Sequence, residues 1–161
     1  MGVTLTGMEV KELGHVVLYV RDVKRSAAFY RDVLGWRQIL PVDGYDRQWR
    51  AAAFNAPSGR THHELLLIEV GEDAAAMPEG KRLGMYHFGL KIGNTDDELR
   101  AARDKLVETG TPILGMSDHT ATHSLYISDP DGNEIELYVD VPGVDWDDPN
   151  IMATPTKQLV L

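Results

Sequence analysis

Two histidines and one glutamate occupy places in this chain from which they could bind a metal together. His15 is the third residue of LGHVVLYV, and His87 is the third residue of MYHFGLKI, 72 residues further on. Glu136 lies in a later β-rich run, EIELYVD. Two imidazoles and one carboxylate on one side of a divalent metal leave the opposite positions open for a substrate. We therefore predict a metal site made by His15, His87 and Glu136.

The composition restricts the chemistry of that site. The chain has no cysteine, which excludes disulfides, thiolate-bound metals and a cysteine nucleophile. Neutral imidazoles and one carboxylate would leave a divalent site with a charge of about +1, which favours an anionic chelating substrate. A histidine in a strand is more often a hydrogen-bonded structural residue. The recurrence of one in each half of the chain, together with Glu136, favours the metal-ligand interpretation.

The two histidines begin two segments that follow the same plan. Residues 13–40 start as a β-rich run and continue as a helix that Asp22 can cap, with Gly35 at its end. The apolar positions of this helix form a one-sided stripe: Ala27, Tyr30, Val33 and Leu34. A one-sided stripe predicts a helix packed on a sheet.

The second segment, residues 85–114, repeats this pattern. Thr95 and Glu98 have the spacing of a capping box, and Gly110 marks the helix end. Its stripe consists of Leu99, Ala102 and Leu106.

Each segment continues into further strands separated by turns. The turns Pro57-Ser58-Gly59 and Asp129-Pro130-Asp131-Gly132 both carry a proline followed two residues later by a glycine. This predicts an α+β fold in which two βαβββ modules form one curved, mostly antiparallel sheet around a metal cleft, with helices outside. We expect a single domain over 1–161, with modules at 12–70 and 84–140 and a C-terminal tail at 141–161.

Charge and hydropathy limit the partners. The net charge is −9 and the basic residues are scattered, so we expect no nucleic-acid partner. The longest apolar runs, such as residues 65–68, are too short to span a bilayer, and the first residues do not read as a signal peptide. We expect no membrane association and a cytoplasmic location.

The residues described so far resemble the vicinal oxygen chelate superfamily, which includes glyoxalase I, bleomycin-resistance proteins and type I extradiol dioxygenases. GHVVLYVRDVKRSAAFYRDVLGW is similar to its opening module, and DPDGNEIELYVD to its closing strand. In that comparison Glu136 matches the metal-ligand glutamate.

Within the superfamily, the chain looks closest to small one-domain extradiol, or catechol 2,3-, dioxygenases. The stretch SDHTATHSLYISDPDGNEIELY resembles their segment around the metal site. Tyr126 then matches the active-site tyrosine, His119 approximates a histidine that orients the substrate or moves protons, and His63 matches the acid/base histidine. His62 and His63 are neighbours, and either could face the site.

The resemblance implies an oxidoreductase that opens the ring of a catechol-type substrate with O2. The implied cofactor is iron(II), with manganese(II) as the alternative, and the partners are a small aromatic diol and dioxygen. The superfamily also makes a homodimer plausible.

The polar and aromatic residues that could surround the metal site also have structural interpretations. Tyr126 could be a surface aromatic, His119 a solvent-exposed loop residue, and His123 an exposed residue at a strand edge. Trp49 and Phe54 either pack in the core or line the pocket.

Two rival functions remain at this point. A glyoxalase I or epimerase-type lyase or isomerase would use zinc, nickel or cobalt and a fourth protein ligand from the first module. The residue 72 positions before Glu136 is Glu64, but an alignment of the strands places Leu65 to Leu67 opposite Glu136, and we favour that alignment. A non-catalytic, bleomycin-resistance-like protein would bind its ligand without the metal.

Overall fold

The computed structural model describes residues 10–41, 50–59 and 61–161. The first half contains β1 (Val16–Val20), α1 (Val23–Ala28), a π-helical turn (Phe29–Val33), β2 (Arg37–Leu40), β3 (Ala51–Asn55) and β4 (Leu65–Glu69). The second half contains β5 (His87–Gly93), α2 (Asp96–Glu108), β6 (Ile113–Asp118), β7 (Thr122–Ser128) and β8 (Glu134–Asp140). A short 3-10 helix (Ile151–Ala153) and β9 (Lys157–Gln158) follow.

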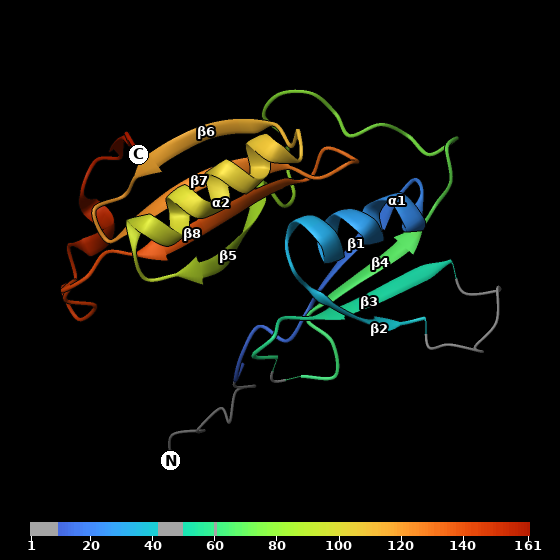
Figure 1. The fold of residues 1–161 in the computed structure, drawn as a ribbon, viewed down its shortest axis with the longest axis horizontal. Coiled ribbons are helices and arrows are strands. Elements are labelled where there is room, and N and C mark those ends of the chain that lie inside the picture. Colours follow the sequence, from blue (N-terminus) through green and yellow to red (C-terminus); the bar gives the residue numbers. More distant parts are fainter. Residues whose placement is uncertain (1–9, 42–49, 60) are drawn as a thin grey trace, which may run out of the picture.

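The predicted α+β class is confirmed, and both halves have the order βαβββ (Figure 1). The strands form two sheets, with the orders β1-β4-β3-β2 and β5-β8-β7-β6-β9, where the sequence predicts one continuous sheet. The division arises because β1 pairs only with β4, and β5 only with β8, within the described residues. These two pairs are parallel and all the others are antiparallel.

Local signals explain both helices. The Asp22 side chain accepts hydrogen bonds from the backbone N–H groups of Lys24 and Arg25, which caps α1, as predicted. Thr95 accepts from the N–H of Glu98, and the Glu98 carboxylate accepts from the Thr95 hydroxyl. Gly35 and Gly110 end the two helical segments with φ of 74° and 67°, a conformation that favours glycine.

Alternation along β8 separates the core from an open face. Ile135, Leu137 and Val139 are buried, on the face of the sheet where α2 packs with Leu99 and Leu106 (Figure 1). Successive strand residues point to opposite faces, so the residues between them lie on the face without a helix. These are Glu134, Glu136, Tyr138 and Asp140, all half-buried. Glu136 therefore lies on the face without a helix, because its two neighbours in β8 belong to the core.

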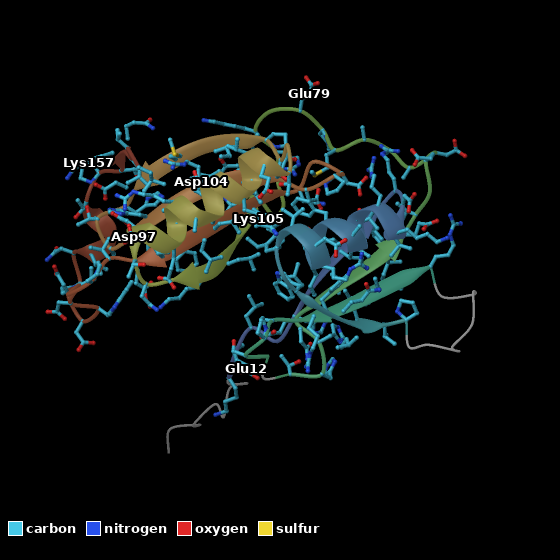
Figure 2. The ribbon with its side chains drawn as sticks, viewed as in Figure 1. Glu12, Glu79, Asp97, Asp104, Lys105 and Lys157 are labelled. Atoms are coloured by element: carbon cyan, nitrogen blue, oxygen red, sulfur yellow. The ribbon has the colours of Figure 1, made fainter. Side chains whose placement is uncertain are left out.

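The remaining surface is strongly charged. Figure 2 shows acidic side chains such as Asp97 and Asp104 on α2.

No helix among residues 10–41, 50–59 and 61–161 is long and apolar enough to cross a bilayer. Phe54 is fully buried and belongs to the core, whereas Trp49 lies outside the described residues.

A buried hydrogen bond connects the two halves. The Tyr30 hydroxyl donates to Asp129 Oδ2 over 2.9 Å, and Ser26 Oγ donates to Asp131 Oδ2 over 3.0 Å. Burial, followed by the charge of Asp129, raises the pKa of Tyr30 far above its ordinary value, so this phenol remains a donor. The turn between β7 and β8 is thus held against the helical segment of the first half.

We predict that Tyr30→Phe lowers the free energy of unfolding by about 1–2 kcal/mol, because Asp129 loses one buried donor. Urea denaturation monitored by circular dichroism measures this. Tyr19→Phe is the matched control, since Tyr19 is 71% exposed. Equal midpoints for the two variants would contradict this assignment.

Candidate active site

The parallel pairing of β5 with β8 brings His87 and Glu136 together. His87 lies opposite Glu134, and Gly89 lies opposite Glu136. From this register, His87 Nε2 approaches Glu136 Oε2 to 3.3 Å, and His87 Nδ1 lies 3.5 Å from Glu134 Oε1. The structure therefore places one imidazole between two carboxylates on the open face of the sheet.

Glu136 also accepts two hydrogen bonds from β7. Ser124 Oγ donates to Glu136 Oε1 over 2.6 Å, and the Tyr126 hydroxyl donates to the same oxygen over 3.0 Å. Burial raises the pKa of Tyr126 above its ordinary value, and the negative charge and hydrogen bond of Glu136 raise it further. Tyr126 therefore keeps its proton at neutral pH and acts as a hydrogen-bond donor.

His119 extends this network away from Glu136. Its Nε2 lies 2.8 Å from the Tyr126 hydroxyl and 3.8 Å from Glu136 Oε1. Its other nitrogen, Nδ1, lies 3.1 Å from Thr156 Oγ1 in the C-terminal tail. Four of the predicted site residues, His87, His119, Tyr126 and Glu136, are therefore brought together in one half of the molecule.

The other two predicted site residues lie in a separate histidine cluster. The ring centroids of His15 and His63 are 4.6 Å apart, and those of His15 and His62 are 5.8 Å apart. His62 is exposed, whereas His63 is half-buried and its Nε2 has no hydrogen-bond partner among the described residues. Burial, and then the neighbouring His62 and His15, lower the pKa of His63 below its ordinary value. These features favour His63 over His62 as a proton acceptor.

The His87–Glu136 pair fits a divalent cation. Its N···O separation of 3.3 Å suits two ligands that share one ion with bonds of about 2.1 Å. Imidazole and carboxylate are suitable ligands for iron(II) or manganese(II). Among the described residues, however, no group of three or more histidine and acidic side chains has the geometry to hold a metal. His15 is thus not brought to the pair.

The register of β1 with β4 shows which residue of the first half corresponds to Glu136 and could be a fourth metal ligand. His15 precedes Val16, which pairs with Leu65, and Val17 pairs with Leu66. Comparison with β5 and β8 makes Leu66 the equivalent of Glu136, and Glu64 the equivalent of Glu134. Glu64 instead accepts a hydrogen bond from the backbone N–H of Ala56 over 2.8 Å. This register agrees with the apolar alignment preferred from the sequence.

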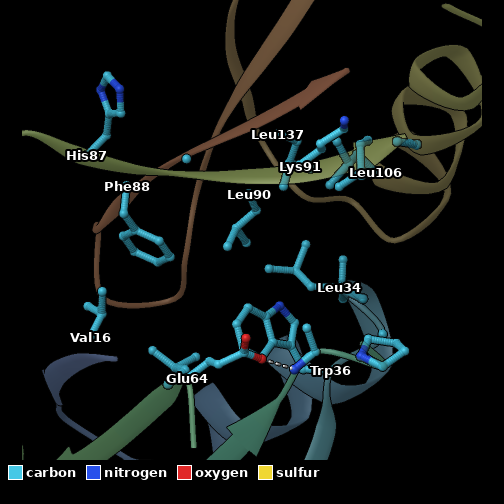
Figure 3. Close-up of a pocket in the computed structure, with 18 of the residues that line it drawn as sticks. Val16, Leu34, Trp36, Glu64, His87, Phe88, Leu90, Lys91, Leu106 and Leu137 are labelled. Carbon is cyan, nitrogen blue, oxygen red and sulfur yellow. Dashed lines mark hydrogen bonds between the residues drawn. The ribbon is translucent and has the colours of Figure 1, made fainter. Parts of the chain in front are cut away.

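Two concave regions adjoin β5, and His87 is among the lining residues of both. Figure 3 shows Leu34 and Trp36 of the first half facing Leu90 across a cavity of about 1050 Å³, and His15 and His87 are also among its lining residues. The other is a smaller hollow of about 310 Å³. Its lining residues are Tyr86, His87, Leu114, Gly115, Ser117, Tyr126 and Glu134. The smaller hollow, which adjoins the polar network, is the better candidate for a substrate.

Three residues of this network, Ser124, Glu134 and Thr156, were not predicted from the sequence. Ser124 lies two residues before Tyr126, and Glu134 two residues before Glu136, so strand alternation could have found both. Thr156 had no signal of this kind. His123 is outside the network: its Nδ1 lies 2.6 Å from Asp96 Oδ1, and it is paired at the start of α2 instead of lying exposed at an edge.

Two βαβββ halves, each with one parallel strand pair, define an α+β fold built from paired modules. Residues 12–137 match the model of the Glyoxalase/Bleomycin resistance protein/Dioxygenase superfamily. The chain belongs to this superfamily.

Two relatives of known name are similar to this chain in sequence. The chain is 36% identical over 138 residues to a catechol-2,3-dioxygenase of Bacillus subtilis (strain 168), covering 86% of this chain and 45% of the relative. It is 32% identical over 140 residues to an iron-dependent extradiol dioxygenase of Rhodococcus jostii (strain RHA1), covering 78% of this chain and 42% of the relative. The chain thus spans less than half the length of these two proteins.

A solved structure supports the fold. A glyoxylase/bleomycin resistance protein/dioxygenase domain from Frankia sp. EAN1pec superposes with a TM-score of 0.66 at 20% identity. The superposition covers 82% of this chain and 99% of the other.

We predict that His62→Asn raises the pKa of His63, because a positive His62 disfavours protonation of its neighbour. The pKa of His63 should remain below the ordinary value of about 6.5, since burial is the larger cause and is retained. An NMR titration of the histidine ring protons measures both values. His123→Asn serves as the control, and an unchanged His63 titration in the His62 variant would argue against the cluster.

Proposed function

We propose that this protein is a metal-dependent extradiol dioxygenase that opens the ring of an aromatic diol with O2. The observation that carries the proposal is the hydrogen-bonded sequence His119–Tyr126–Glu136, which ends beside His87. It provides a proton donor and an orienting histidine next to a candidate metal ligand. The relatives named as catechol and extradiol dioxygenases support the same reaction.

The proposed metal ligands are His15, His87 and Glu136. His87 and Glu136 are already adjacent, and His15 is proposed as the third ligand because it is the counterpart of His87 in the first half. Iron(II) is the proposed ion, with manganese(II) as the alternative, and one relative is named iron-dependent. When bound, such an ion acts as a Lewis acid toward the diol and allows electron transfer to dioxygen.

The protein's own residues bind the diol and move its protons. Tyr126 keeps its proton and is placed to donate a hydrogen bond to a substrate oxygen that replaces Glu136 Oε1 as acceptor. His119 holds the Tyr126 hydroxyl in position. His63, in the histidine cluster of the first half, is proposed as the acid/base group, since its lowered pKa keeps it neutral near pH 7.

The small hollow beside His87 is the proposed substrate site. Its volume of about 310 Å³ is at the lower end of the range for small-molecule pockets. The rings of Tyr86 and Tyr126 and the side chain of Leu114 provide apolar contact for an aromatic ring.

A ligand-sequestering protein is the second candidate. The observation in its favour is that His87 and Glu136 have no third metal ligand within the part of the chain that the structure describes. The Leu66 register argues against a lyase that requires a fourth ligand from β4.

We predict that Glu136→Ala and His15→Ala each abolish iron binding and catechol cleavage, because each removes one of three proposed ligands. Anaerobic reconstitution with iron(II), metal analysis and an oxygen electrode with catechol measure the two effects. His123→Asn is the control and should behave like the unmodified chain. If His15→Ala retained one iron per chain and full oxygen uptake, His15 would not be a ligand.

We predict that His63→Phe retains iron but lowers kcat by about 10²-fold or more, because a positioned acid/base group contributes roughly that much. Steady-state oxygen uptake and metal analysis on the same preparation separate the two properties. His62→Phe is the matched control and should lose less than half an order of magnitude. A reversal of the two effects would assign the role to His62.

A further inference from the structure

The C-terminal tail is docked beside the site by several independent contacts. β9 pairs with β6, with Lys157 opposite Asp118 and Gln158 opposite Ser117. Leu159 is 6% exposed and belongs to the core, and Arg103 donates a hydrogen bond to the backbone oxygen of Leu161 over 3.1 Å. These anchors follow Thr156 directly, so the Thr156 hydroxyl is held in a fixed position next to His119.

The number of protons on each group determines which atoms donate and which accept in the hydrogen-bond network from Glu136 to Thr156. The Glu136 carboxylate can only accept, and the Tyr126 hydroxyl has a single proton, which it donates to Glu136. The Tyr126 oxygen must then accept from His119, so His119 carries its proton on Nε2. A neutral imidazole has one N–H, which leaves His119 Nδ1 as an acceptor, and the donor 3.1 Å away is the Thr156 hydroxyl.

The opposite tautomer would redirect the Tyr126 proton. With the proton on Nδ1, His119 would donate to Thr156 and present an unprotonated Nε2 to Tyr126. That nitrogen would compete with Glu136, and with any substrate oxygen there, for the only phenolic proton. The tautomer of His119 therefore determines where Tyr126 donates.

We propose that Thr156 is a positioning residue that selects the Nε2–H tautomer of His119 by donating a hydrogen bond to Nδ1. It acts through His119 and Tyr126 and does not contact the reacting atoms. Its catalytic consequence rests on the proposed dioxygenase function, whereas the tautomer assignment does not.

The tautomer is tested directly by NMR on the full-length, metal-free protein. Long-range ¹H–¹⁵N correlation of ¹⁵N-labelled side chains distinguishes the two tautomers, with His119→Asn used to assign the signal. We expect the Nε2–H form in the unmodified chain and in Thr156→Ser, and loss of that preference in Thr156→Val. Thr154→Val, two residues away on the same exposed tail, is the matched control. An unchanged His119 tautomer in Thr156→Val would overturn the proposal.

Kinetics on the iron-loaded protein test the consequence. Loss of one orienting hydrogen bond should lower kcat of Thr156→Val about three- to tenfold, with KM for catechol nearly unchanged. Thr156→Ser keeps the hydroxyl but lacks the methyl group, and it should have the unmodified rate. If Thr156 acted only through packing of its methyl group, Thr156→Ser would lose activity instead. Failure of the unmodified chain and of every variant to cleave catechol would contradict the dioxygenase function, while the tautomer result would still decide the role of Thr156. Equal kcat for Thr156→Val and Thr154→Val would count against the catalytic consequence.

Discussion

The Glu136 carboxylate is the group on which the rest of the site depends. Its side chain is 16% exposed, so it has lost most of its contact with water. A carboxylate in this position needs donors, and the structure provides them from neighbouring strands: the hydroxyls of Ser124 and Tyr126 on β7, with His87 on β5 nearby. These donors satisfy one carboxylate oxygen and leave Oε2 directed toward the imidazole. The same arrangement makes Glu136 a suitable ligand for a cation.

Strand register maintains this arrangement. The β7–β8 ladder runs without a bulge from Thr122 to Ser128, and Tyr126 lies opposite Glu136. A slip of one residue would move Glu136 to the core face and expose Leu137 or Ile135, at a cost of several kcal/mol of lost apolar burial. The irregular pairings in this sheet lie elsewhere, between Lys91 and Gly93 in β5 and between Ile113 and Gly115 in β6. The apolar core therefore fixes the site geometry through alternation.

The sequence predicted most of the second half and less of the first. Caps, turn residues and apolar periodicity are local signals, and they located the helices after Asp22 and Thr95. Tyr126 was assigned to the site of Glu136 through the family resemblance. The division into two sheets and the separation of His15 from His87 depend on how the two halves pack, which no local pattern encodes. The contact between Thr156 and His119 spans 37 positions and involves an exposed threonine with no periodic neighbour. Such long-range polar contacts become visible only when the fold is known.

The two halves offer different kinds of metal ligand: carboxylates with one imidazole in the second half, and imidazoles in the first. The open face of the second half gathers two carboxylates, Glu134 and Glu136, around one imidazole. The first half gathers His15, His62 and His63, where burial and then the neighbouring His62 and His15 lower the pKa of His63. Its nearby carboxylate, Glu64, is engaged with the backbone of Ala56. Carboxylate oxygens and neutral imidazole nitrogens are both stabilised by a divalent cation. This complementarity is the physical reason for proposing a metal that draws ligands from both halves.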